Sequence, residues 1–502
     1  MFPPTIRARR RLVPDLPTST LADAIARLWP DTDTLPLADE ARLVLDSRHV
    51  ETGDVFVALP GTRVDGRQYI DQARDRGAAL ILVAPPWQET ADDLLILDDL
   101  PERLGQLASL VMGVPDSLEQ IAVTGTNGKS SVTHYIAALS EALATPAGLI
   151  GTLGSGRPGM LEHAGLTTPD AISLQQRLRE LAVAGAERVA LEASSHALDQ
   201  HRLSGCCIRA AVFTNLSRDH LDYHPSMAAY AAAKARLFQR PELELAVVNA
   251  DDALARLMLA GVSKKASVLR VGSQDSHDFQ VRRWQAQRLG LEAGIMTPEG
   301  ERTLRLSLMG RFNLDNVLLA IATLYGLGSP LDALMKAAEQ LTPVPGRMQL
   351  LARPDAPAVV VDYAHTPDAL RNALLALREH VPGRLWCVLG CGGDRDTGKR
   401  PLMGGVAALL ADEVVVTDDN PRSEPPEDIR RMIMSEMPQG AHVREVAGRA
   451  QAIADVVARA GAQDVILLAG KGHEDYQEIQ GVRYPFSDMD VASLALEAHW
   501  HE

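Results

Sequence analysis

The sequence is short of basic side chains and of cysteine, and its apolar runs are brief. Lys and Arg total 50 against 65 for Asp and Glu, which gives the 502 residues a net charge of −15. This balance argues against a nucleic-acid backbone as the main partner, so anionic ligands must be held by local clusters. Because no stretch approaches the roughly 18 uninterrupted apolar residues of a spanning helix, we expect no membrane span.

Features of a secreted protein are also lacking. The four cysteines form two close pairs, Cys206/Cys207 and Cys387/Cys391, whose spacing is unlike that of a CxxC zinc or redox site. We expect reduced, partly buried thiols, as in a cytosol. Four arginines near the N-terminus are followed by a short stretch broken by prolines, residues 12–17, so no signal peptide is predicted. The sequence therefore indicates a cytoplasmic protein.

The length and the hydrophobic content of 46% predict about three domains. Residues 1–116 alternate apolar runs at 55–59 and 80–83 with a helical stretch at 69–76. This alternation predicts a small N-terminal α/β domain.

Two further domains repeat the alternation of strands and helix-length segments. Residues 117–342 have predicted strands at 121–123, 188–191, 210–214 and 246–249. Residues 343–502 follow a proline-rich linker and have predicted strands at 359–362, 385–389, 413–417 and 465–468. Such alternation is typical of a mainly parallel sheet, so we predict a P-loop ATPase-type central domain and a Rossmann-like C-terminal domain.

The strongest single motif is Gly125-Thr126-Asn127-Gly128-Lys129-Ser130-Ser131, between a predicted strand and a predicted helix. Backbone N–H groups and the helix N-terminus can cradle phosphate oxygens there, while Lys129 neutralises their charge and a serine hydroxyl binds Mg²⁺. The strict GxxxxGK[ST] pattern fails, because Val123 stands where its first glycine belongs. We predict an ATP site at this loop, and a chance glycine-rich turn is the alternative.

Other positions in the central domain have both a functional and an ordinary interpretation. Glu192 follows an apolar strand and could complete a magnesium site, or it could be a solvated or N-capping side chain. His220 and His224 are spaced as in zinc proteases, but Pro225 favours a loop that leads into a helix. Lys234 lies on an alanine-rich helix, where a lysine is ordinarily a solvated charge.

In this order, the segments TGTNGKSS, LEASSHALDQHR, FTNLSRDHLDYH and AAKARLF resemble the central domain of the Mur ligases, which build the peptidoglycan stem peptide. The resemblance implies that Lys129, Glu192, His220 and Lys234 are catalytic. It also implies that Lys234 is carbamylated, which turns a cation into an anion that helps to hold Mg²⁺. The implied metal ligands are Ser130, Glu192, His220 and Lys234.

Motifs outside the central domain extend the resemblance to essentially the whole chain. Residues 45–48 and 53–58 resemble the UDP-binding domain of the branch that adds the third amino acid, MurE; residues 166–169 resemble its muramoyl-peptide contact, and residues 361–367 the opening of its C-terminal domain. The implied contacts to UDP-MurNAc-dipeptide are Leu45, Ser47, Thr62, Arg63, Val64, Thr167, Thr168, Ser194, Gln200 and Arg202. The implied ATP contacts are Thr124, Gly125, Thr126, Asn127, Gly128, Lys129, Ser130 and Ser131, with Asn313 of a GRFN motif and Asn316 three residues after it.

The added amino acid is predicted from Asp419-Asn420-Pro421-Arg422, which matches the signature of family members specific for meso-diaminopimelate. Diaminopimelate carries a second α-amino acid head that lysine lacks, and the planar Arg422 guanidinium can take its carboxylate in two parallel hydrogen bonds. Lysine would leave Arg422 unpaired, at a cost of about 1–3 kcal/mol.

The rest of the implied diaminopimelate pocket is Arg395, Gly470 and Glu474, and Glu474 would receive the distal ammonium. Read without the family, each of these three is a loop residue between a strand and a helix, for which a surface role is the alternative.

The resemblance implies an ATP-dependent ligase that adds meso-2,6-diaminopimelate to UDP-MurNAc-L-Ala-D-Glu through an acyl phosphate, in peptidoglycan precursor synthesis. Its partners would be small molecules, with no nucleic acid, and we expect a monomer. Within the family, the rivals are an L-lysine-adding ligase and a folylpolyglutamate-type ligase, the latter disfavoured by the UDP-side motif. Outside it, a P-loop kinase or NTPase would act without regard to diaminopimelate, and a regulator would bind nucleotide without turnover.

Overall fold

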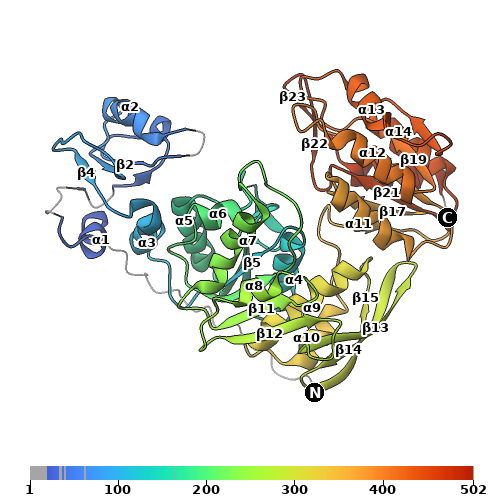
Figure 1. Ribbon diagram of the computed structural model, residues 1–502, viewed down its shortest axis with the longest axis horizontal. Helices are drawn as coiled ribbons and strands as arrows, with labels where there is room; N and C mark the ends of the chain where they lie inside the picture. Colours follow the sequence, from blue (N-terminus) through green and yellow to red (C-terminus); the bar gives the residue numbers. More distant parts are fainter. Residues whose placement is uncertain (1–19, 33–36, 39–40, 62–63, 164, 501–502) are drawn as a thin grey trace, which may run out of the picture. The chain divides into compact units, whose positions relative to one another are not determined.

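The computed structural model describes residues 20–32, 37–38, 41–61, 64–163 and 165–500. The chain divides into two compact units, one made of residues 1–248 with 252–268 and the other of residues 249–251 with 269–502. Figure 1 follows the chain by colour through both units. The domain boundaries at 116 and 342 remain predictions.

The N-terminal part of the first unit is a four-stranded parallel sheet that is buried on both faces. Along β2, Val55 and Val57 pack with residues of α1 and α3, whereas Phe56 and Ala58 pack with residues of α2. Successive side chains of a strand point to opposite faces, so double burial requires a continuous apolar run. The helix expected at 69–76 is α2, Ile70–Asp75, which directly follows a 3₁₀ turn, Gly66–Tyr69. The other elements are α1 (Leu21–Leu28), β1 (Leu43–Val44), β2 (Val55–Ala58), α2 (Ile70–Asp75), β3 (Leu80–Val83), β4 (Leu94–Ile96) and α3 (Leu100–Met112).

A second, mainly parallel sheet in the first unit has the order β11-β10-β5-β9-β6-β7-β8. The strands from β11 to β6 are parallel, and β7 and β8 are antiparallel additions. Because β9 and β10 flank β5, the segments that follow these three strands meet at one edge of the sheet. The strands are β5 (Glu119–Thr124), β6 (Ala147–Gly151), β7 (Gly154–Arg157), β8 (Met160–Glu162), β9 (Arg188–Glu192), β10 (Ile208–Phe213) and β11 (Leu245–Asn249). The helices are α4 (Lys129–Ala142), α5 (Ala171–Val183), α6 (Ser195–Asp199), α7 (Met227–Ala235) and α8 (Ala255–Leu259).

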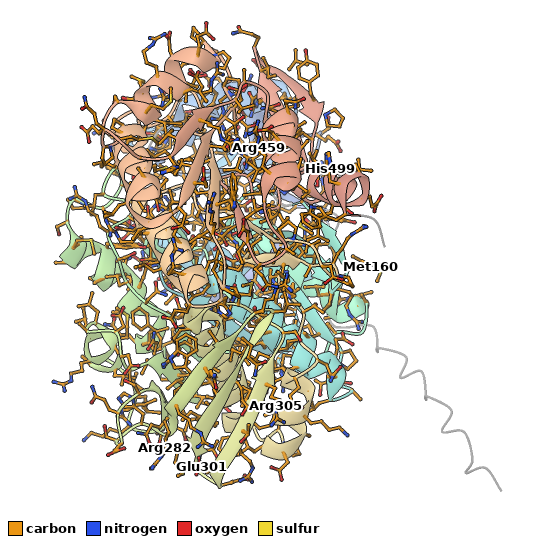
Figure 2. The ribbon with its side chains drawn as sticks, turned by 90° about the vertical axis from the view of Figure 1, so that its right-hand side faces the viewer. Met160, Arg282, Glu301, Arg305, Arg459 and His499 are labelled. Atoms are coloured by element: carbon orange, nitrogen blue, oxygen red, sulfur yellow. The ribbon has the colours of Figure 1, made fainter. Side chains whose placement is uncertain are left out.

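The second unit contains an antiparallel meander that the sequence analysis did not predict. Strands β13, β14 and β15 pair antiparallel in succession. Arg282, Glu301 and Arg305 are exposed residues of this meander and are labelled in Figure 2. The elements are β12 (Ser267–Gly272), which spans the division between the units, β13 (Phe279–Gln287), β14 (Gly290–Thr297), β15 (Gly300–Leu306), α9 (Arg311–Gly326) and α10 (Leu331–Ala338).

The C-terminal part of the second unit is a six-stranded sheet in the order β16-β17-β21-β18-β19-β20. All neighbours are parallel except β16 and β17. Helices α11 to α13 cover one face of this sheet, and α14 and α15 cover the other, which confirms the predicted Rossmann-like arrangement. The strands are β16 (Gln349–Leu351), β17 (Ala358–Asp362), β18 (Leu385–Leu389), β19 (Glu413–Val416), β20 (Val443–Glu445) and β21 (Val465–Ala469). The remaining elements are α11 (Pro367–Arg378), α12 (Lys399–Leu410), α13 (Pro426–Met434), α14 (Arg449–Arg459), α15 (Asp488–His499) and a hairpin of β22 (Tyr476–Ile479) with β23 (Val482–Pro485).

Two expectations from composition can be compared with the structure. Among the described residues, no helix is both long enough and apolar enough to span a bilayer. All four cysteines are free thiols, and three of them are buried, as predicted.

Candidate functional site

The predicted phosphate loop joins β5 to α4 and is held in shape by the segment after β10. Gly128 has φ +85°, and a Cβ added at Gly125 would overlap the Thr214 hydroxyl oxygen, so both positions require glycine. The Thr126 N–H donates to the Asn215 carbonyl at 2.8 Å, and the Asn127 N–H donates to the Asn215 side chain at 3.0 Å. The structure thus places the predicted loop where backbone N–H groups and the start of α4 come together.

Lys129 lies over this loop. Its ammonium donates to the carbonyls of Gly125 at 3.0 Å and Thr126 at 2.8 Å. The cation is therefore within a side-chain rotation of any phosphate that the loop would hold.

Glu192 is the last residue of β9 and is only 1% exposed. Its carboxylate accepts hydrogen bonds from the Ser130 hydroxyl at 2.9 Å and from the N–H and hydroxyl of Thr152 at 2.9 and 3.1 Å. The solvated and N-capping alternatives for Glu192 are wrong, because the side chain is buried and Ser194 caps α6. Carboxylate and hydroxyl oxygens are the ligands that Mg²⁺ prefers, so Ser130 and Glu192 fit this ion.

Lys234 is a buried lysine, although the sequence alone favoured a solvated one. It is 1% exposed on α7, its amine donates to the Gly125 carbonyl at 2.8 Å, and it lies 4.6 Å from the Tyr230 ring centroid. Burial, with a smaller effect of the Lys129 cation, holds the pKa of Lys234 well below its ordinary value, and Asp219 opposes this only in part. A lowered pKa favours the neutral amine, which is the form that can react with CO₂ to give a carbamate. Carbamylation itself remains a prediction.

The histidines of the DHLDYH segment lie in a turn and not on one helical face. His220 has φ +53°, and α7 begins only at Met227, as Pro225 led us to expect. Among the described residues, no group of three or more His, Cys, Asp or Glu side chains is placed to hold a metal ion. His220 Nε2 lies 3.4 Å from Asp219 Oδ2.

A cluster of aromatic and imidazole rings surrounds His220. The ring of His196 lies 4.9 Å from that of His220 and 4.1 Å from that of Tyr223, between centroids. Burial lowers the pKa of His196 to about 4, with smaller contributions from His220 and His224, and burial also lowers the pKa of the latter two. A lowered pKa favours the neutral imidazole, which is the form that ligates a metal ion.

The residues expected to contact the muramoyl dipeptide fall into two groups. Thr168, Ser194, Gln200 and Arg202 form one network: the Thr168 hydroxyl donates to the Glu192 carbonyl at 2.6 Å, and Arg202 donates to the Thr168 carbonyl at 2.9 Å and to the Gln200 side chain at 2.6 Å. The Thr168 hydroxyl also accepts from the Ser194 N–H at 3.1 Å. Burial lowers the pKa of Arg202, as expected of a desolvated guanidinium. This network joins the backbone of Glu192 to a half-buried guanidinium suited to a substrate carboxylate.

Thr167 adjoins the same network, because its hydroxyl lies within hydrogen-bonding distance of that of Thr152, at 3.1 Å. The second group belongs to the N-terminal sheet. Ser47 is buried and donates to Gln72 at 2.6 Å, Leu45 is half-buried, and Val64 is 58% exposed. Thr62 and Arg63 lie outside the described residues.

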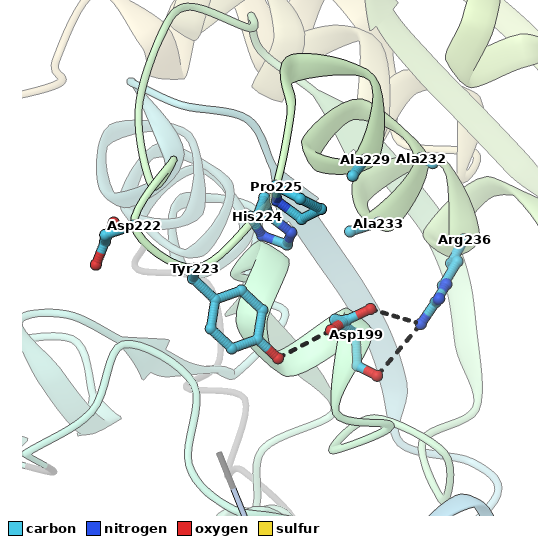
Figure 3. Close-up of a pocket in the computed structure, with 9 residues that line it drawn as sticks. All are labelled: Asp199, Asp222, Tyr223, His224, Pro225, Ala229, Ala232, Ala233 and Arg236. Carbon is cyan, nitrogen blue, oxygen red and sulfur yellow. Dashed lines mark hydrogen bonds and ion pairs between the residues drawn. The ribbon is translucent and has the colours of Figure 1, made fainter. Parts of the chain in front are cut away.

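A pocket of about 550 Å³ opens beside this network (Figure 3). Tyr223 donates to Asp199 at 2.8 Å and accepts from the Gln200 amide at 3.1 Å, while Arg236 pairs with Asp199 at 3.1 Å. Figure 3 shows His224 and Pro225 on the side of the pocket toward α7. The predicted substrate contact Gln200 is thus linked through Tyr223 to Asp199 and Arg236, which the sequence analysis did not single out.

The remaining predicted ATP contacts lie in the second unit. Asn313 and Asn316 are both buried in the first turns of α9, and the Asn313 amide donates to the Met309 carbonyl at 2.9 Å. Their contact with ATP remains a prediction.

Arg422, the residue expected to select the amine substrate, lies after β19 in a left-handed conformation with φ +51°. Its backbone N–H donates to the Glu478 carbonyl at 3.0 Å, and its carbonyl accepts from the Gln480 N–H at 2.7 Å. Its guanidinium donates to the Gly393 carbonyl at 2.7 Å and lies 3.6 Å from the Glu478 carboxylate. The hairpin of β22 and β23 therefore holds a backbone conformation that arginine seldom adopts.

Asn420 and Glu474 lie together in the same unit. The Asn420 amide donates to Glu474 Oε2 at 2.8 Å, and a Cβ added at Gly470 would lie 2.6 Å from Asp419 Oδ2. The surface alternative is wrong for Glu474, whose side chain is 19% exposed and hydrogen-bonded, whereas Arg395 is exposed.

Sequence reasoning missed several supporting residues. Thr152 holds Glu192, and Asn215 holds the phosphate loop, each from the segment after a neighbouring strand. Lys471 directly follows the predicted pocket residue Gly470 but was assigned no role, although its side chain is fully buried. A lysine between two glycines, directly after an apolar strand, could have marked this position.

Comparison with known proteins gives concordant matches along the chain. Residues 42–111 match the Mur ligase family catalytic domain, residues 123–324 the Mur ligase middle domain, and residues 346–472 the Mur ligase glutamate ligase domain. The chain is 48% identical over 484 residues to the UDP-N-acetylmuramoyl-L-alanyl-D-glutamate--2,6-diaminopimelate ligase of Pseudomonas syringae pv. tomato, covering 95% of this chain and 99% of the relative. The ligase of that name from Neisseria meningitidis is 44% identical over 480 residues, covering 92% and 96%.

Solved structures agree with the sequence matches. A structure of a UDP-N-acetylmuramoyl-L-alanyl-D-glutamate--2,6-diaminopimelate ligase superimposes with a TM-score of 0.73 at 38% identity, over 95% of this chain and 99% of the other. A MurF from Acinetobacter baumannii, at 19% identity and a TM-score of 0.63 over 95% and 98% of the two chains, shares the fold. The chain therefore belongs to the Mur ligase family.

Proposed function

We propose that this protein is an ATP-dependent ligase that joins meso-2,6-diaminopimelate to UDP-MurNAc-L-Ala-D-Glu. One observation carries the proposal. Hydrogen bonds hold both the backbone and the guanidinium of Arg422 in place, in the same unit as the hydrogen-bonded pair Asn420 and Glu474. These residues supply a guanidinium for a second carboxylate and a carboxylate for a second ammonium, which only a diamino diacid can satisfy together. The names of relatives at 44 to 48% identity support the same substrates.

The first chemical step uses ATP because a carboxylate is a poor acyl donor. The D-glutamate carboxylate attacks the γ-phosphorus of ATP, which forms an acyl phosphate and breaks the bond to ADP. Lys129 at the phosphate loop would offset the charge of the transferred group, and Arg202, whose guanidinium donates to the Thr168 carbonyl, would hold the substrate carboxylate. Ser130, Glu192, His220 and carbamylated Lys234 would hold Mg²⁺, which when bound neutralises phosphate charge.

In the second step, the amine of diaminopimelate attacks the acyl carbon, phosphate leaves with the bonding electrons, and the amine loses a proton. Selection of the amine rests on Arg422 and Glu474, and the family resemblance adds Arg395 to them. Lysine would leave the Arg422 guanidinium without its substrate carboxylate, at a cost of about 1–3 kcal/mol. The lysine-adding alternative is therefore disfavoured.

The test is phosphate release measured with ATP, UDP-MurNAc-L-Ala-D-Glu and either meso-diaminopimelate or L-lysine. We expect release that requires both the nucleotide-linked dipeptide and diaminopimelate. Equal rates with lysine would remove the role of Arg422, release without either substrate would indicate a kinase or NTPase, and binding without turnover would indicate a regulator.

The proposal has four further parts. We place the protein in the cytoplasm, because ATP and a UDP-linked precursor are its substrates. We propose that it acts as a monomer, that Lys234 carries a carbamate, and that residues 1–116, 117–342 and 343–502 form the UDP-binding, ATP-binding and amino-acid-binding domains.

A further inference from the structure

Lys471 is a fully buried lysine at the carboxyl end of β21. Its ammonium donates to Asn420 Oδ1 and to Glu474 Oε2, each at 3.1 Å. The ring centroids of Tyr476 and Phe486 lie 5.6 and 5.9 Å from the same nitrogen. Two acceptor oxygens and two aromatic rings therefore surround a charge that would be costly to bury alone.

The backbone around Lys471 directs the side chain inward. Gly470 and Gly472 have φ of +115° and +54°, so the lysine sits between two residues whose conformations favour glycine. Just before them, Arg449 donates to the Ala469 carbonyl at 3.0 Å and fixes the end of the strand. The position of the ammonium is thus set by the fold and not by a flexible loop.

Lys471 and Asn420 together orient the Glu474 carboxylate. Oε2 receives two hydrogen bonds, one from the Asn420 amide at 2.8 Å and one from Lys471 at 3.1 Å. The Asn420 amide is itself oriented, because its Oδ1 accepts from the Glu478 N–H at 3.0 Å. Within the described part of the chain, the hydrogen bonds to this carboxylate all reach Oε2, which leaves Oε1 to accept a hydrogen bond from a ligand.

We propose that Lys471 is a positioning residue for the amine substrate: it fixes the Glu474 carboxylate so that Oε1 accepts the distal ammonium of a diamino acid. The inference rests on the proposed function, since it assigns Glu474 to that substrate. A carboxylate that is already oriented loses less conformational freedom when the ammonium binds, and supporting hydrogen bonds of this kind commonly decide how well a contacting residue works.

The test uses Lys471→Met, Glu474→Gln and the double variant, with two amine substrates. Diaminopimelate is compared with 2-aminopimelate, which keeps the reacting amino acid head and the distal carboxylate but lacks the distal amino group. We expect Lys471→Met to raise the KM for diaminopimelate about tenfold to a hundredfold, the effect of losing one hydrogen bond to a charged group. The KM for ATP should stay within about twofold, and selectivity for diaminopimelate over 2-aminopimelate should fall by the same factor as its KM rises.

The double variant distinguishes positioning from general damage. If Lys471 acts through Glu474, adding Lys471→Met to Glu474→Gln should change the KM by less than about twofold. Arg378→Met is the matched control, because it also removes a cation from this unit, at a site bonded to Asp412 and Leu410 before β19. If thermal unfolding shows that Lys471→Met does not fold, Lys471→Gln provides the same comparison.

Two results would overturn the inference alone: equal losses with both amines, or effects of Lys471→Met and Glu474→Gln that multiply in the double variant. A wild-type protein that releases no phosphate with diaminopimelate would instead overturn the proposed function, and the inference with it.

Discussion

Glu424 connects the loop that carries Arg395 with the loop that carries Arg422, the two arginines predicted to bind the amine substrate. Arg400, whose side chain is fully buried, donates two parallel hydrogen bonds of 2.8 Å to the Glu424 carboxylate. Glu424 also accepts from the Asp394 N–H at 2.6 Å, and Arg400 donates to the Gly392 carbonyl at 3.2 Å. The perturbation that tests this arrangement is Glu424→Gln, which keeps the side-chain shape but removes the charge.

The expected loss of unfolding free energy depends on how exposed Arg400 and Glu424 are. Leaving a buried charge unpaired typically costs about 3–5 kcal/mol, but Glu424 is 27% exposed, so water can replace part of its contact with Arg400. We therefore expect the free energy of unfolding to fall by about 1–3 kcal/mol at pH 7, the range for a hydrogen bond to a charged group.

The pH dependence of this loss has a definite sign. The hydrogen bonds from Arg400, followed by that from the Asp394 N–H, lower the pKa of Glu424 from 4.5 to about 2. A lowered folded-state pKa contributes stability that is complete above the ordinary pKa and disappears as the pH falls toward the folded one. Between pH 7 and pH 4 the difference in the free energy of unfolding between wild type and Glu424→Gln should therefore shrink by about 1 kcal/mol.

The assay is a urea titration followed by hydrogen–deuterium exchange of peptides from α12 and α13, so that this unit is observed separately. Glu436→Gln, the same chemical change at an exposed position nearby, should leave the midpoint unchanged. A Glu424→Gln midpoint equal to that of wild type at pH 7, or a loss that stays constant down to pH 4, would refute the reasoning.

Three predictions concern the first unit. Glu192→Gln should reduce phosphate release by about 10²–10³-fold and raise the Mg²⁺ requirement, since it removes a charge from a buried acceptor, whereas Glu187→Gln at an exposed position should not. Lys234→Ala should abolish turnover, and full activity of this variant with and without bicarbonate would exclude an essential carbamate. Gly125→Ala should raise the KM for ATP at least about tenfold, because a Cβ overlaps the Thr214 hydroxyl; calorimetry showing wild-type nucleotide affinity would contradict this.

Short apolar runs and the turn residues that bound them predicted most of the strands and helices. The strands expected at 80–83 and 385–389 are β3 and β18 with identical bounds, and α4 begins at Lys129 as expected. Short apolar runs bounded by turn residues identify strands that are buried on both faces. The β13–β15 meander was missed because its strands alternate apolar and polar residues imperfectly, with a register shift between Val281 and Arg283.

The candidate site could be assembled from sequence only as a set of motifs. Ser130 and Glu192 are 62 positions apart in the chain, and their hydrogen bond exists because β5 and β9 are neighbours in the sheet. The order of parallel strands is a property of the whole sheet, which local periodicity does not encode.

By itself, the sequence determined the α/β character of the protein, the phosphate loop and the residues of the Arg422 segment, because each depends on residue types at fixed short spacing. Only the tertiary structure decided the state of the lysines. Lys234 and Lys471 look in the sequence like ordinary solvated cations, yet both side chains are buried with their nitrogens on specific oxygens. Segments that are distant in the sequence pack over a side chain and determine whether it is buried. Burial in turn sets the electrostatic cost of its charge and the chemistry that the charged group can perform.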